Sequence, residues 1–380
     1  MGFAALLLGW LTLLFALGSI GYTLLAIIAV GRFAGALNPP LGTPEPVTVL
    51  KPLHGLEPRL RDNLASFVDQ DWDAPIQIVA GSNVLDDPAL LLARDLKIEI
   101  ATANGSHPVG GNAKIANLSN MMRFATNDLL ILSDSDIAVP KDYVASVAAT
   151  LEQPLVGAVT CIYRGRADAL GWSRFAAAAI SYQFAPSVVV SYALGAEQAC
   201  MGSTIALHRV TLQRIGGFEA FANCLADDHA IGMAVRGLGL KVAPVPRMLL
   251  QHACAEESFM AVWLHEVRWA ATVRGVNWKG HLGSLLTHPL PLSLLATALM
   301  PEAGAVLVAA SLVVRFILAR TIDRWAGEQT APMWWLPARD LFSFAVFIAS
   351  FAARSVDWRG ARLRIGPRGQ LTAKPEIRVP

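Results

Sequence analysis

Several common features are absent from this 380-residue sequence, and each absence excludes a class of protein. The four cysteines show no Cys-x-x-Cys spacing, so the sequence indicates neither a zinc site nor a disulfide framework. Positive charge is not in excess, because 31 basic residues against 29 acidic residues leave a net charge of +2. That balance argues against nucleic acid as the main partner. The sequence also has no repeat of solenoid length and no low-complexity tract.

Charge is also missing from residues 3–30, a stretch longer than the roughly 20 residues that a helix needs to cross a bilayer. A cleaved signal peptide would have a basic start and an apolar core of only about 7–15 residues, and this stretch has neither. Arg32 follows the apolar stretch, so the positive-inside rule places the next domain in the cytoplasm. We therefore predict a transmembrane helix or signal anchor at this end.

Apolar residues return towards the carboxyl end of the chain. Residues 282–300 and 303–318 predict two further spans, and Pro301-Glu302 between them predicts a tight connection on the outer side. Residues 341–353 are too few for a crossing, so we expect a re-entrant or interfacial segment there. The sequence thus predicts a multi-pass membrane protein, with a bacterial inner membrane as the expected location and the catalytic domain in the cytoplasm.

A segment at residues 170–194 is apolar but interrupted by Pro186. We expect helices that lie against the membrane surface or line a lipid-sized cavity, with ordinary buried helices as the alternative. The predicted domain boundaries are a transmembrane helix at 1–31, a proline-rich linker at 32–46, an α/β domain at 47–280, a membrane region at 281–356 and a cytosolic tail, forming a small hairpin, at 357–380.

The pattern of apolar residues from residue 47 onward is typical of an α/β domain. Short runs of β-branched and aliphatic residues alternate with helical patterns, which predicts parallel strands joined by right-handed crossovers. The predicted strands cover residues 47–50, 76–79, 97–100, 129–133, 157–163 and 203–207. The predicted helices cover residues 59–68, 87–95, 114–124 and 224–239. This pattern is typical of a doubly wound, nucleotide-binding domain.

Two acids follow the apolar run at residues 129–132, which predicts a fully buried strand. Asp134 and Asp136 alternate in an extended chain, so both side chains can reach one cation at the carboxyl edge of the sheet. One or two carboxylates plus substrate phosphates are the usual ligands of Mg²⁺, so the motif suggests that the bound ligand is a nucleoside diphosphate. The simpler interpretation is that these acids cap the turn before Pro140, and the motif alone is too short to decide.

Two later motifs offer partners for these acids. Asp227 and Asp228 stand at a predicted helix start, where the helix dipole favours a carboxylate, although simple N-capping explains them about as well. His265 and Arg268 are three residues apart on a predicted helix and so share one face that can meet a diphosphate, while Trp269 can pack against a ring. An isolated helix with this pattern would more often present a solvated charged face.

The combined order of motifs resembles the inverting glycosyltransferases with a GT-A nucleotide-binding fold, specifically the ceramide glucosyltransferases of family 21 and the related bacterial hopanoid-pathway glycosyltransferases. The resemblance covers about residues 47–274, and the membrane layout extends it over nearly the whole chain. The supporting stretches are Val49-Leu50-Lys51-Pro52-Leu53-His54-Gly55, Asn112-Ala113-Lys114-Ile115-Ala116-Asn117, Ser133-Asp134-Ser135-Asp136, Gly216-Gly217-Phe218, Leu225-Ala226-Asp227-Asp228-His229 and His265-Glu266-Val267-Arg268-Trp269. It implies a Rossmann-like mixed sheet with an amino-terminal transmembrane helix and a carboxyl-terminal membrane region.

The resemblance also implies roles for individual residues. Asp228 matches the family's general base, which takes the proton of the acceptor hydroxyl. Asp134 and Asp136 would hold a divalent cation, Mg²⁺ or Mn²⁺, that stabilises the departing nucleoside diphosphate. Lys114, Asp134, His265 and Arg268 would lie on the donor side, and Asp227, Gly202, Tyr182 and Trp269 would lie on the acceptor side.

Two positions depart from the family pattern. The family has an acid just after the second strand that holds the uridine, whereas this chain has Ser82 and Asn83 there, which can hydrogen-bond the base instead. The family's last motif begins with Gln or Arg, and here it begins with His265. Phosphate binding by His265 would then depend on pH around its ordinary pKa of about 6.5.

The expected function is therefore that of a hexosyltransferase that moves a sugar from a UDP-sugar to a lipid hydroxyl. Glucose transfer to ceramide is the leading interpretation, and transfer of N-acetylglucosamine to a bacteriohopanepolyol is the alternative. A non-catalytic protein that binds a nucleotide sugar or a lipid is the third interpretation. Processive polysaccharide synthases share the motifs but need more transmembrane helices, and the long soluble insert argues against a transporter.

Overall fold

The computed structural model describes residues 3–101, 111–169, 171–196, 199–353, 355–358 and 361–364. Contacts within the chain divide it into two compact units. The sheet unit comprises Gly35–Arg164 and Gly195–Ala253, and the helical unit comprises Met1–Ala34, Gly165–Leu194 and Cys254–Pro380. Residues 165–194 and 254–280, which we expected within the α/β domain, fall in the helical unit by this division.

The sheet unit is built on an eight-stranded mixed sheet with the order β3-β2-β1-β4-β7-β6-β8-β5. The first four strands in this order are parallel, and β7 then pairs antiparallel with both β4 and β6. The strands are β1 (Val47–Pro52), β2 (Ile76–Gly81), β3 (Glu99–Ala101), β4 (Leu129–Leu132), β5 (Ile137–Ala138), β6 (Val156–Ala167), β7 (Ile205–His208) and β8 (Lys241–Cys254). This mixed, Rossmann-like sheet confirms the predicted fold class.

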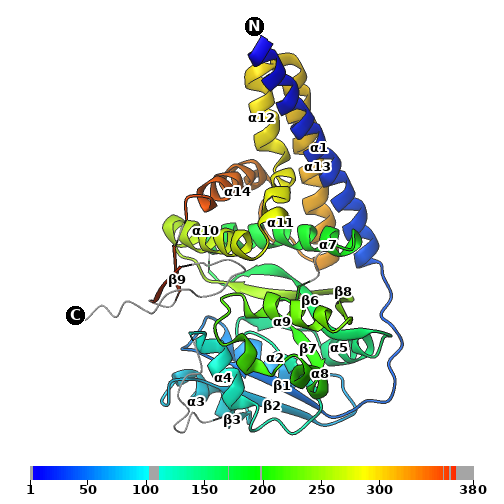
Figure 1. The fold of residues 1–380 in the computed structure, drawn as a ribbon, viewed down its shortest axis with the longest axis vertical. Helices are drawn as coiled ribbons and strands as arrows, with labels where there is room; N and C mark the ends of the chain where they lie inside the picture. Colours follow the sequence, from blue (N-terminus) through cyan, green and yellow to red (C-terminus); the bar gives the residue numbers. More distant parts are fainter. Residues whose placement is uncertain are drawn as a thin grey trace, which may run out of the picture. The chain divides into compact units, whose positions relative to one another are not determined.

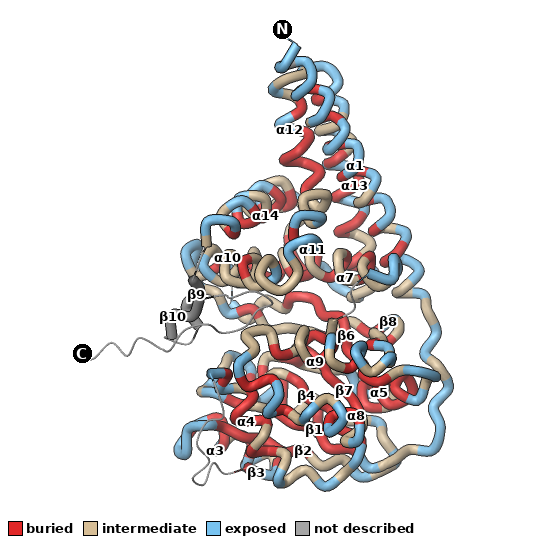
Figure 2. The backbone as a smooth tube through the Cα atoms, in the orientation of Figure 1, coloured by how far each residue is buried: buried red, intermediate tan, exposed pale blue. Residues whose placement is uncertain are grey.

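Helices cover the faces of this sheet (Figure 1). They are α2 (Leu60–Val68), α3 (Pro88–Asp95), α4 (Ala113–Met121), α5 (Tyr143–Leu151), α8 (Arg209–Arg214), the 3₁₀ turn η2 (Phe218–Phe221) and α9 (Asp227–Gly237). Aliphatic side chains from both layers form the core, and Leu50, Leu132, Ile115 and Leu118 are each at most 2% exposed. Figure 2 shows the central strands as mostly buried.

The strand register decides which residues meet at the carboxyl edge of the parallel strands. Leu50 of β1 pairs with Leu132 of β4, so the residues that follow each of them, Lys51 and Ser133, lie at the same level. The antiparallel β7 begins at this edge, because its first residue, Ile205, also pairs with Leu132. Loops before β7 and after β4 are therefore neighbours, which is where open α/β sheets bind their ligands.

The helical unit contains the long apolar helices. Figure 1 shows α1 running beside α12 and α13, whereas α7 and α10 run across one end of these helices. The elements are α1 (Phe3–Ala34), α6 (Trp172–Ala179), the π-helical turn η1 (Ile180–Phe184), α7 (Ala185–Ala193), α10 (Phe259–Val276), α11 (Trp278–Gly283), η3 (Ser284–Thr287), α12 (Pro289–Leu299), α13 (Pro301–Ala326), η4 (Met333–Trp335), α14 (Leu336–Ser350), β9 (Ser355–Trp358) and β10 (Ala361–Arg364).

Three helices in the described part of the chain are long and apolar enough to cross a membrane, at Leu6–Ala34, Trp172–Ala193 and Pro301–Ala326. The first and third agree with the predicted spans. The segment at Trp172–Ala193 passes the same test, although we expected it at the membrane surface or lining a cavity. Pro186 does not end it, because the π-helical turn η1 directly precedes α7 and the carbonyl of Tyr182, four residues before the proline, accepts from Nη1 of Arg315 instead. Its apolar window is 56% buried, more than in the other two helices.

The structure divides the predicted span at residues 282–300 between two helices. The structure breaks it at His288, where Trp278–Thr287 and Pro289–Leu299 form a pair bent by 68°. Pro289 cannot continue a preceding helix, so it begins a new one. The pair is either a broken span or a re-entrant loop. The tight connection predicted at Pro301 is confirmed, because α12 ends at Leu299 and α13 begins at Pro301.

The predicted interfacial segment and tail hairpin both correspond to observed elements. Residues 341–353 lie mostly within α14, which is too short to count among the candidate spans. β9 and β10 pair antiparallel, so a hairpin is present, although it begins before Trp358. The rest of the tail, including Gly366 and Gly369, lies outside the described residues. Which side of a membrane these elements face stays a prediction.

Candidate active site

A single residue, Gly202, connects Asp134, which follows β4, to Asp228 in the first turn of α9. The backbone N–H of Asp134 donates to the carbonyl of Gly202 (3.0 Å), and the N–H of Gly202 donates to Oδ2 of Asp228 (3.1 Å). Gly202 precedes β7, so this geometry follows from the antiparallel pairing of β4 and β7. Asp134, Gly202 and Asp228, which lie far apart in the sequence, thus form one cluster at the sheet edge.

Lys114 connects this cluster to Asp227. Its Nζ lies 2.7 Å from Oδ1 of Asp134 and 3.4 Å from Oδ2 of Asp227. Burial alone would lower the pKa of Lys114, but the charges of Asp134, Asp227 and Asp228 raise it above its ordinary value. The side chain of Asn112 caps α4 by accepting hydrogen bonds from the N–H groups of Lys114 and Ile115. This cap fixes the backbone position of Lys114 in the first turn of α4.

Gly202 leaves room that no other residue would leave. A Cβ at this position would lie 2.2 Å from Oδ2 of Asp134 and 3.4 Å from Nζ of Lys114. Contacts under 3.0 Å require something to move, and here the nearest atom belongs to a carboxylate already held by Lys114. Gly202 is therefore required by the close approach of the Asp134 side chain to the backbone.

The second acid of the Asp-x-Asp motif, Asp136, faces a different partner. Its Oδ2 lies 3.2 Å from Nε2 of His252 on β8, which pairs with β5 beside the motif. Burial alone would raise the pKa of Asp136, but the neighbouring His252 holds it below the ordinary value. The ring of Tyr163 stacks on His252 at a centroid distance of 5.3 Å, so the imidazole is fixed against Asp136.

Lys51 lies beneath the motif and is fully buried. Its ammonium donates to Oγ of Ser133 and to the backbone carbonyl of Asp134, and it lies 3.9 Å from the centroid of the Phe67 ring. Burial lowers the pKa of Lys51 to about 7, even though Asp134, Asp136 and Glu57 act to raise it. The Lys-Pro motif at the end of β1 therefore supports the Asp-x-Asp loop from inside the sheet unit.

Asp228 is a carboxyl group whose pKa lies above its ordinary value. Burial raises its pKa to about 6, and the charge of Asp227 adds to this shift, while Lys114 opposes it. Its two carboxylate oxygens accept from the backbone N–H groups of Gly202 and His229. A carboxylate with a pKa near the working pH is mostly ionised and still accepts a proton readily.

Ser82 and Asn83, which stand where the family has the acid that holds the uridine, lie in a loop held by side-chain hydrogen bonds. The hydroxyl of Ser82 donates to Oδ2 of Asp87 (2.7 Å), and Asp87 also accepts from the N–H groups of Gly55 and Ala89. Asp87 is therefore committed to capping α3 and holding the loop at Gly55. Asn83 is exposed and donates to the carbonyl of Ala113 (2.6 Å), one residue before Lys114.

The acid cluster fits a divalent cation by charge and by its ligand atoms. In the described residues no three His, Cys, Asp or Glu side chains are arranged to hold a metal. Two carboxylates suffice, however, when substrate phosphates and water complete the shell. Oδ1 of Asp136 is buried and has no hydrogen-bond partner among the described residues. The four acids, Asp134, Asp136, Asp227 and Asp228, outnumber the two ammonium groups of Lys51 and Lys114.

The remaining predicted residues belong to the helical unit. His265, Arg268 and Trp269 lie on α10, as predicted, and each is partly buried. Nδ1 of His265 contacts Oε1 of Glu256, and the His265 ring stands edge-on to Trp269 at 4.8 Å. This contact orients the histidine that replaces the family's Gln or Arg.

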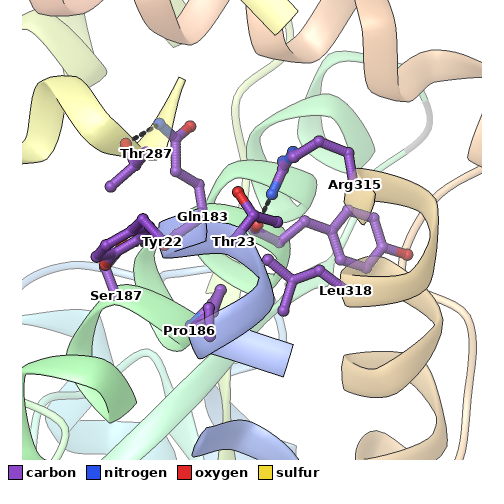
Figure 3. Close-up of a pocket in the computed structure, with 10 residues that line it drawn as sticks. Tyr22, Thr23, Gln183, Pro186, Ser187, Thr287, Arg315 and Leu318 are labelled. Carbon is purple, nitrogen blue, oxygen red and sulfur yellow. Dashed lines mark hydrogen bonds between the residues drawn. The ribbon is translucent and has the colours of Figure 1, made fainter. Parts of the chain in front are cut away.

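Tyr182, which we expected near the lipid entry, is fully buried. Its hydroxyl donates to Oδ1 of Asp323 on α13 (2.8 Å), and its backbone carbonyl accepts from Nη1 of Arg315 (2.8 Å). Tyr182 lines a small cavity among α1, η1, α7 and α13, whose other lining residues include Tyr22, Gln183 and Arg315 (Figure 3). Its expected place on the acceptor side stays a prediction.

Sequence reasoning did not identify Lys51, His252 or Glu256 as site residues. Lys51 stood in a recognised motif, and its position directly after the predicted strand at residues 47–50 was the available signal. His252 and Glu256 gave no local signal, because each is brought to its partner by pairing or packing of distant segments.

The sheet topology and the acids at one edge define a GT-A type glycosyltransferase fold. The chain belongs to glycosyl transferase family 21, because the model of that family matches residues 11–371. Ceramide glucosyltransferase 1 and ceramide glucosyltransferase 3 of Caenorhabditis elegans are each 27% identical to this chain over 218 residues. These matches cover 55% and 54% of this chain and 46% of each relative, so the chain matches about half the length of these curated relatives.

A solved structure supports the fold independently. The mannosyltransferase PcManGT from Pyrobaculum calidifontis, in complex with GDP-Man and Mn²⁺, has a TM-score of 0.52 and 17% sequence identity. The match covers 90% of this chain and 99% of that chain. At this identity the likeness shows the fold alone. The predicted family and the predicted fold are therefore both confirmed.

Proposed function

We propose that this protein is a membrane-bound inverting glycosyltransferase that moves a sugar from a UDP-sugar to a lipid hydroxyl. The observation that carries the proposal is the link from the backbone N–H of Asp134 through Gly202 to the side chain of Asp228. This link supports the proposal because Asp134, the predicted cation ligand, and Asp228, whose pKa is raised to about 6, then belong to one cluster. In the proposed reaction the base and the cation act on the same donor and acceptor, so the groups that supply them must lie close together.

Asp228 acts as the general base in this proposal. Its carboxylate takes the proton of the lipid hydroxyl, and the resulting oxygen attacks the anomeric carbon of the donor. The bond from that carbon to the diphosphate oxygen breaks on the opposite face, so the configuration inverts and UDP leaves. Asp227, whose Oδ1 lies 3.3 Å from Nδ2 of Asn112, helps to raise the pKa of Asp228 by its charge.

Charge develops on the departing diphosphate, and several side chains are available to stabilise it. A divalent cation, Mg²⁺ or Mn²⁺, held by Asp134 and Asp136 supplies the strongest such interaction when bound. The ammonium of Lys114 lies beside Asp134 and can bind a phosphate oxygen, since lysine acts as a point charge towards phosphate. Arg268 and His265 on α10 are proposed as further donor-side residues, and Ser82 and Asn83 as contacts to the base.

The acceptor is proposed to be a lipid, with ceramide as the first choice. Two curated relatives are ceramide glucosyltransferases, and the apolar helices of this chain are suited to a membrane. Trp269 and Tyr182, both in the helical unit, are the proposed acceptor-side residues together with Gly202 and Asp227. Glucose is correspondingly the proposed sugar.

A transfer assay with the purified full chain in lipid vesicles tests this proposal. We expect UDP-glucose and Mn²⁺ or Mg²⁺ to give glucosylated ceramide, and removal of the cation with EDTA to stop transfer. Vesicles that contain a bacteriohopanepolyol, supplied with UDP-N-acetylglucosamine, test the alternative acceptor. Product in that reaction alone would replace the ceramide assignment and keep the transferase.

A non-catalytic binding protein predicts a different result in the same assay. Such a protein would bind UDP but would neither transfer the sugar nor hydrolyse the donor at any cation concentration. Product with either lipid therefore excludes it, whereas UDP binding without transfer or hydrolysis would contradict the proposed enzymatic function.

A further inference from the structure

Adjacent charged residues near the start of α14 contact two different helices. Nη2 of Arg339 contacts Oε2 of Glu266 on α10. The next residue, Asp340, accepts two hydrogen bonds from Arg315 on α13, at 2.9 and 2.7 Å. All of these residues belong to the helical unit. The helix α14 therefore ties the apolar helix α13 to the helix that carries Arg268.

A second contact fixes the other end of α14 to the same helix. Both outer nitrogens of Arg274, in the last turn of α10, donate to the carbonyls of Phe351 and Ala353, at 2.9 and 2.6 Å. Figure 1 shows α14 lying close to α10. Glu266 and Arg274 are about 12 Å apart along α10 at 1.5 Å per residue. Two separated contacts restrain both the tilt and the rotation of α10.

The pair of Arg339 and Glu266 holds two helices together at the cost of desolvating two charged groups. Arg339 is 1% exposed and lies between the rings of Phe175 and Phe342, at 4.7 and 4.8 Å from their centroids. Among the described residues, Nε and Nη1 of Arg339 and Oε1 of Glu266 have no hydrogen-bond partner. Apolar side chains of similar volume often stabilise as well or better than a buried ion pair. Directional geometry is what the ion pair adds.

Glu266 belongs to the same turn of α10 as the predicted donor-side residues. Glu266 lies between His265 and Arg268, so its contact sets the rotation of the turn that carries the donor-side motif. The end of an arginine side chain lies far from the helix axis, so even a small rotation of α10 displaces it. Misplacement of about 1 Å at a reacting group can cost about 100-fold in rate.

We propose that Arg339 and Glu266 are positioning residues that fix the rotation of α10 and therefore the orientation of Arg268 and Trp269 on that helix. The inference rests on the proposed function, because it assigns Arg268 to the donor. Neither Arg339 nor Glu266 contacts the substrate in this proposal. Their effect should therefore fall on the donor rather than on folding alone.

The test compares Arg339→Gln, Glu266→Gln and the double variant in the full chain. We expect each single variant to raise KM for UDP-glucose and to weaken UDP binding, measured by calorimetry with Mg²⁺, by at least about tenfold. KM for the lipid acceptor should change by less than about threefold. The double variant should recover part of the UDP affinity, since neither partner is then left as an unpaired buried charge.

Two control variants separate positioning from general destabilisation. Arg209→Gln removes hydrogen bonds from Arg209 to the carbonyls of Ala125 and Asn127, at 2.9 and 2.8 Å, without touching α10. Arg320→Gln removes a partly exposed arginine from α13. We expect both to keep the wild-type KM for UDP-glucose, even if Arg209→Gln lowers the melting temperature.

Three results would overturn the positioning role. The first is an unchanged KM for UDP-glucose in both single variants. The second is a loss of stability equal to that of Arg209→Gln with no donor-specific effect, and the third is no recovery in the double variant. Failure of the proposed function gives a different result, because the wild-type chain itself would then neither transfer sugar nor hydrolyse UDP-glucose.

Discussion

Buried charges are arranged differently in the two units of this protein. In the sheet unit four carboxylates lie around the ammonium groups of Lys51 and Lys114. Burial lowers the pKa of each lysine, whereas the neighbouring acids raise it. In the helical unit two buried pairs are matched one to one, Arg315 with Asp340 and Arg339 with Glu266. Both arrangements bury charge, but only the first leaves negative charge in excess.

Such a difference is expected between a site that binds a cationic ligand and contacts that hold helices together. An excess of negative charge is unfavourable until a cation arrives, and functional sites commonly store such unfavourable electrostatics. A matched pair is satisfied within the protein, and its loss leaves one charge buried without compensation. Substitutions in the two units should therefore act in opposite directions on stability.

The largest expected effect is that of Asp228→Asn. Removing the base should lower transfer by about 10⁴-fold, at the upper end of typical general-base contributions, while UDP binding survives. Burial has raised the pKa of Asp228, so its ionised form disfavours the folded state, and the substitution should stabilise the protein by about 1–2 kcal/mol at neutral pH. Transfer assays, UDP calorimetry and thermal unfolding measure the three quantities.

Asp128→Asn is the matched control, because Asp128 is an exposed acid that lies 3.7 Å from Arg209. It should leave transfer unchanged and should not raise the melting temperature. Full turnover by Asp228→Asn would remove the base assignment.

The next largest effect is expected in the helical unit, for Arg315→Met. Breaking a buried pair typically costs about 3–5 kcal/mol, because Asp340 would be left as an unpaired buried charge. We expect a lower melting temperature in detergent and partial recovery in the double variant Arg315→Met with Asp340→Leu. A single variant as stable as the wild type would show that the charges in the helical unit are not matched in the way described.

Gly202→Ala is expected to have an intermediate effect on activity. The added Cβ would lie 2.2 Å from Oδ2 of Asp134, so the carboxylate must move away from Lys114. We predict a loss of about 10- to 100-fold in kcat/KM for the donor, since small displacements at a reacting centre are costly. Gly237→Ala is the control, because nothing lies within 4 Å of the added atom. Equal kinetics of the two variants would contradict the close approach at Gly202.

The smallest effect is expected from pH. Asp228 must be ionised to act as a base, and its pKa is raised to about 6. The value of kcat/KM should therefore fall by about twofold between pH 7 and pH 6 and then about tenfold per unit below pH 6. Stability should move the other way, because the folded state binds more protons than the unfolded state between about pH 4 and pH 6. A rate that is flat down to pH 5 would contradict the assignment.

Much of the sheet unit could be predicted from the sequence because its signals are local. The apolar run of β4 and the alternation of strands and helices placed the Asp-x-Asp motif at the sheet edge, as observed. The long strand β8 was not predicted, because Pro244 and Pro246 weaken its strand pattern. His252, which follows in the same strand, was missed for that reason.

The helical unit was harder to predict because its features depend on contacts between distant helices. Composition identified α1 and α13, but it did not show the break at His288, where Pro289 begins a new helix. The ties of α14 to α10 and α13 involve residues that are ordinary in the sequence. A charged pair such as Arg339-Asp340 gives no local sign that one member points to each of two helices.

The central claim is that the acid cluster transfers sugar to a lipid, and lipid mass spectrometry tests it most directly. The measurement compares lipids from cells that carry the wild-type chain, the Asp228→Asn variant or no copy of the protein. We predict a hexosylated lipid, expected to be hexosylceramide, that is present only with the wild-type chain. Identical lipid profiles in all three, with the wild-type protein folded in the membrane, would contradict the account.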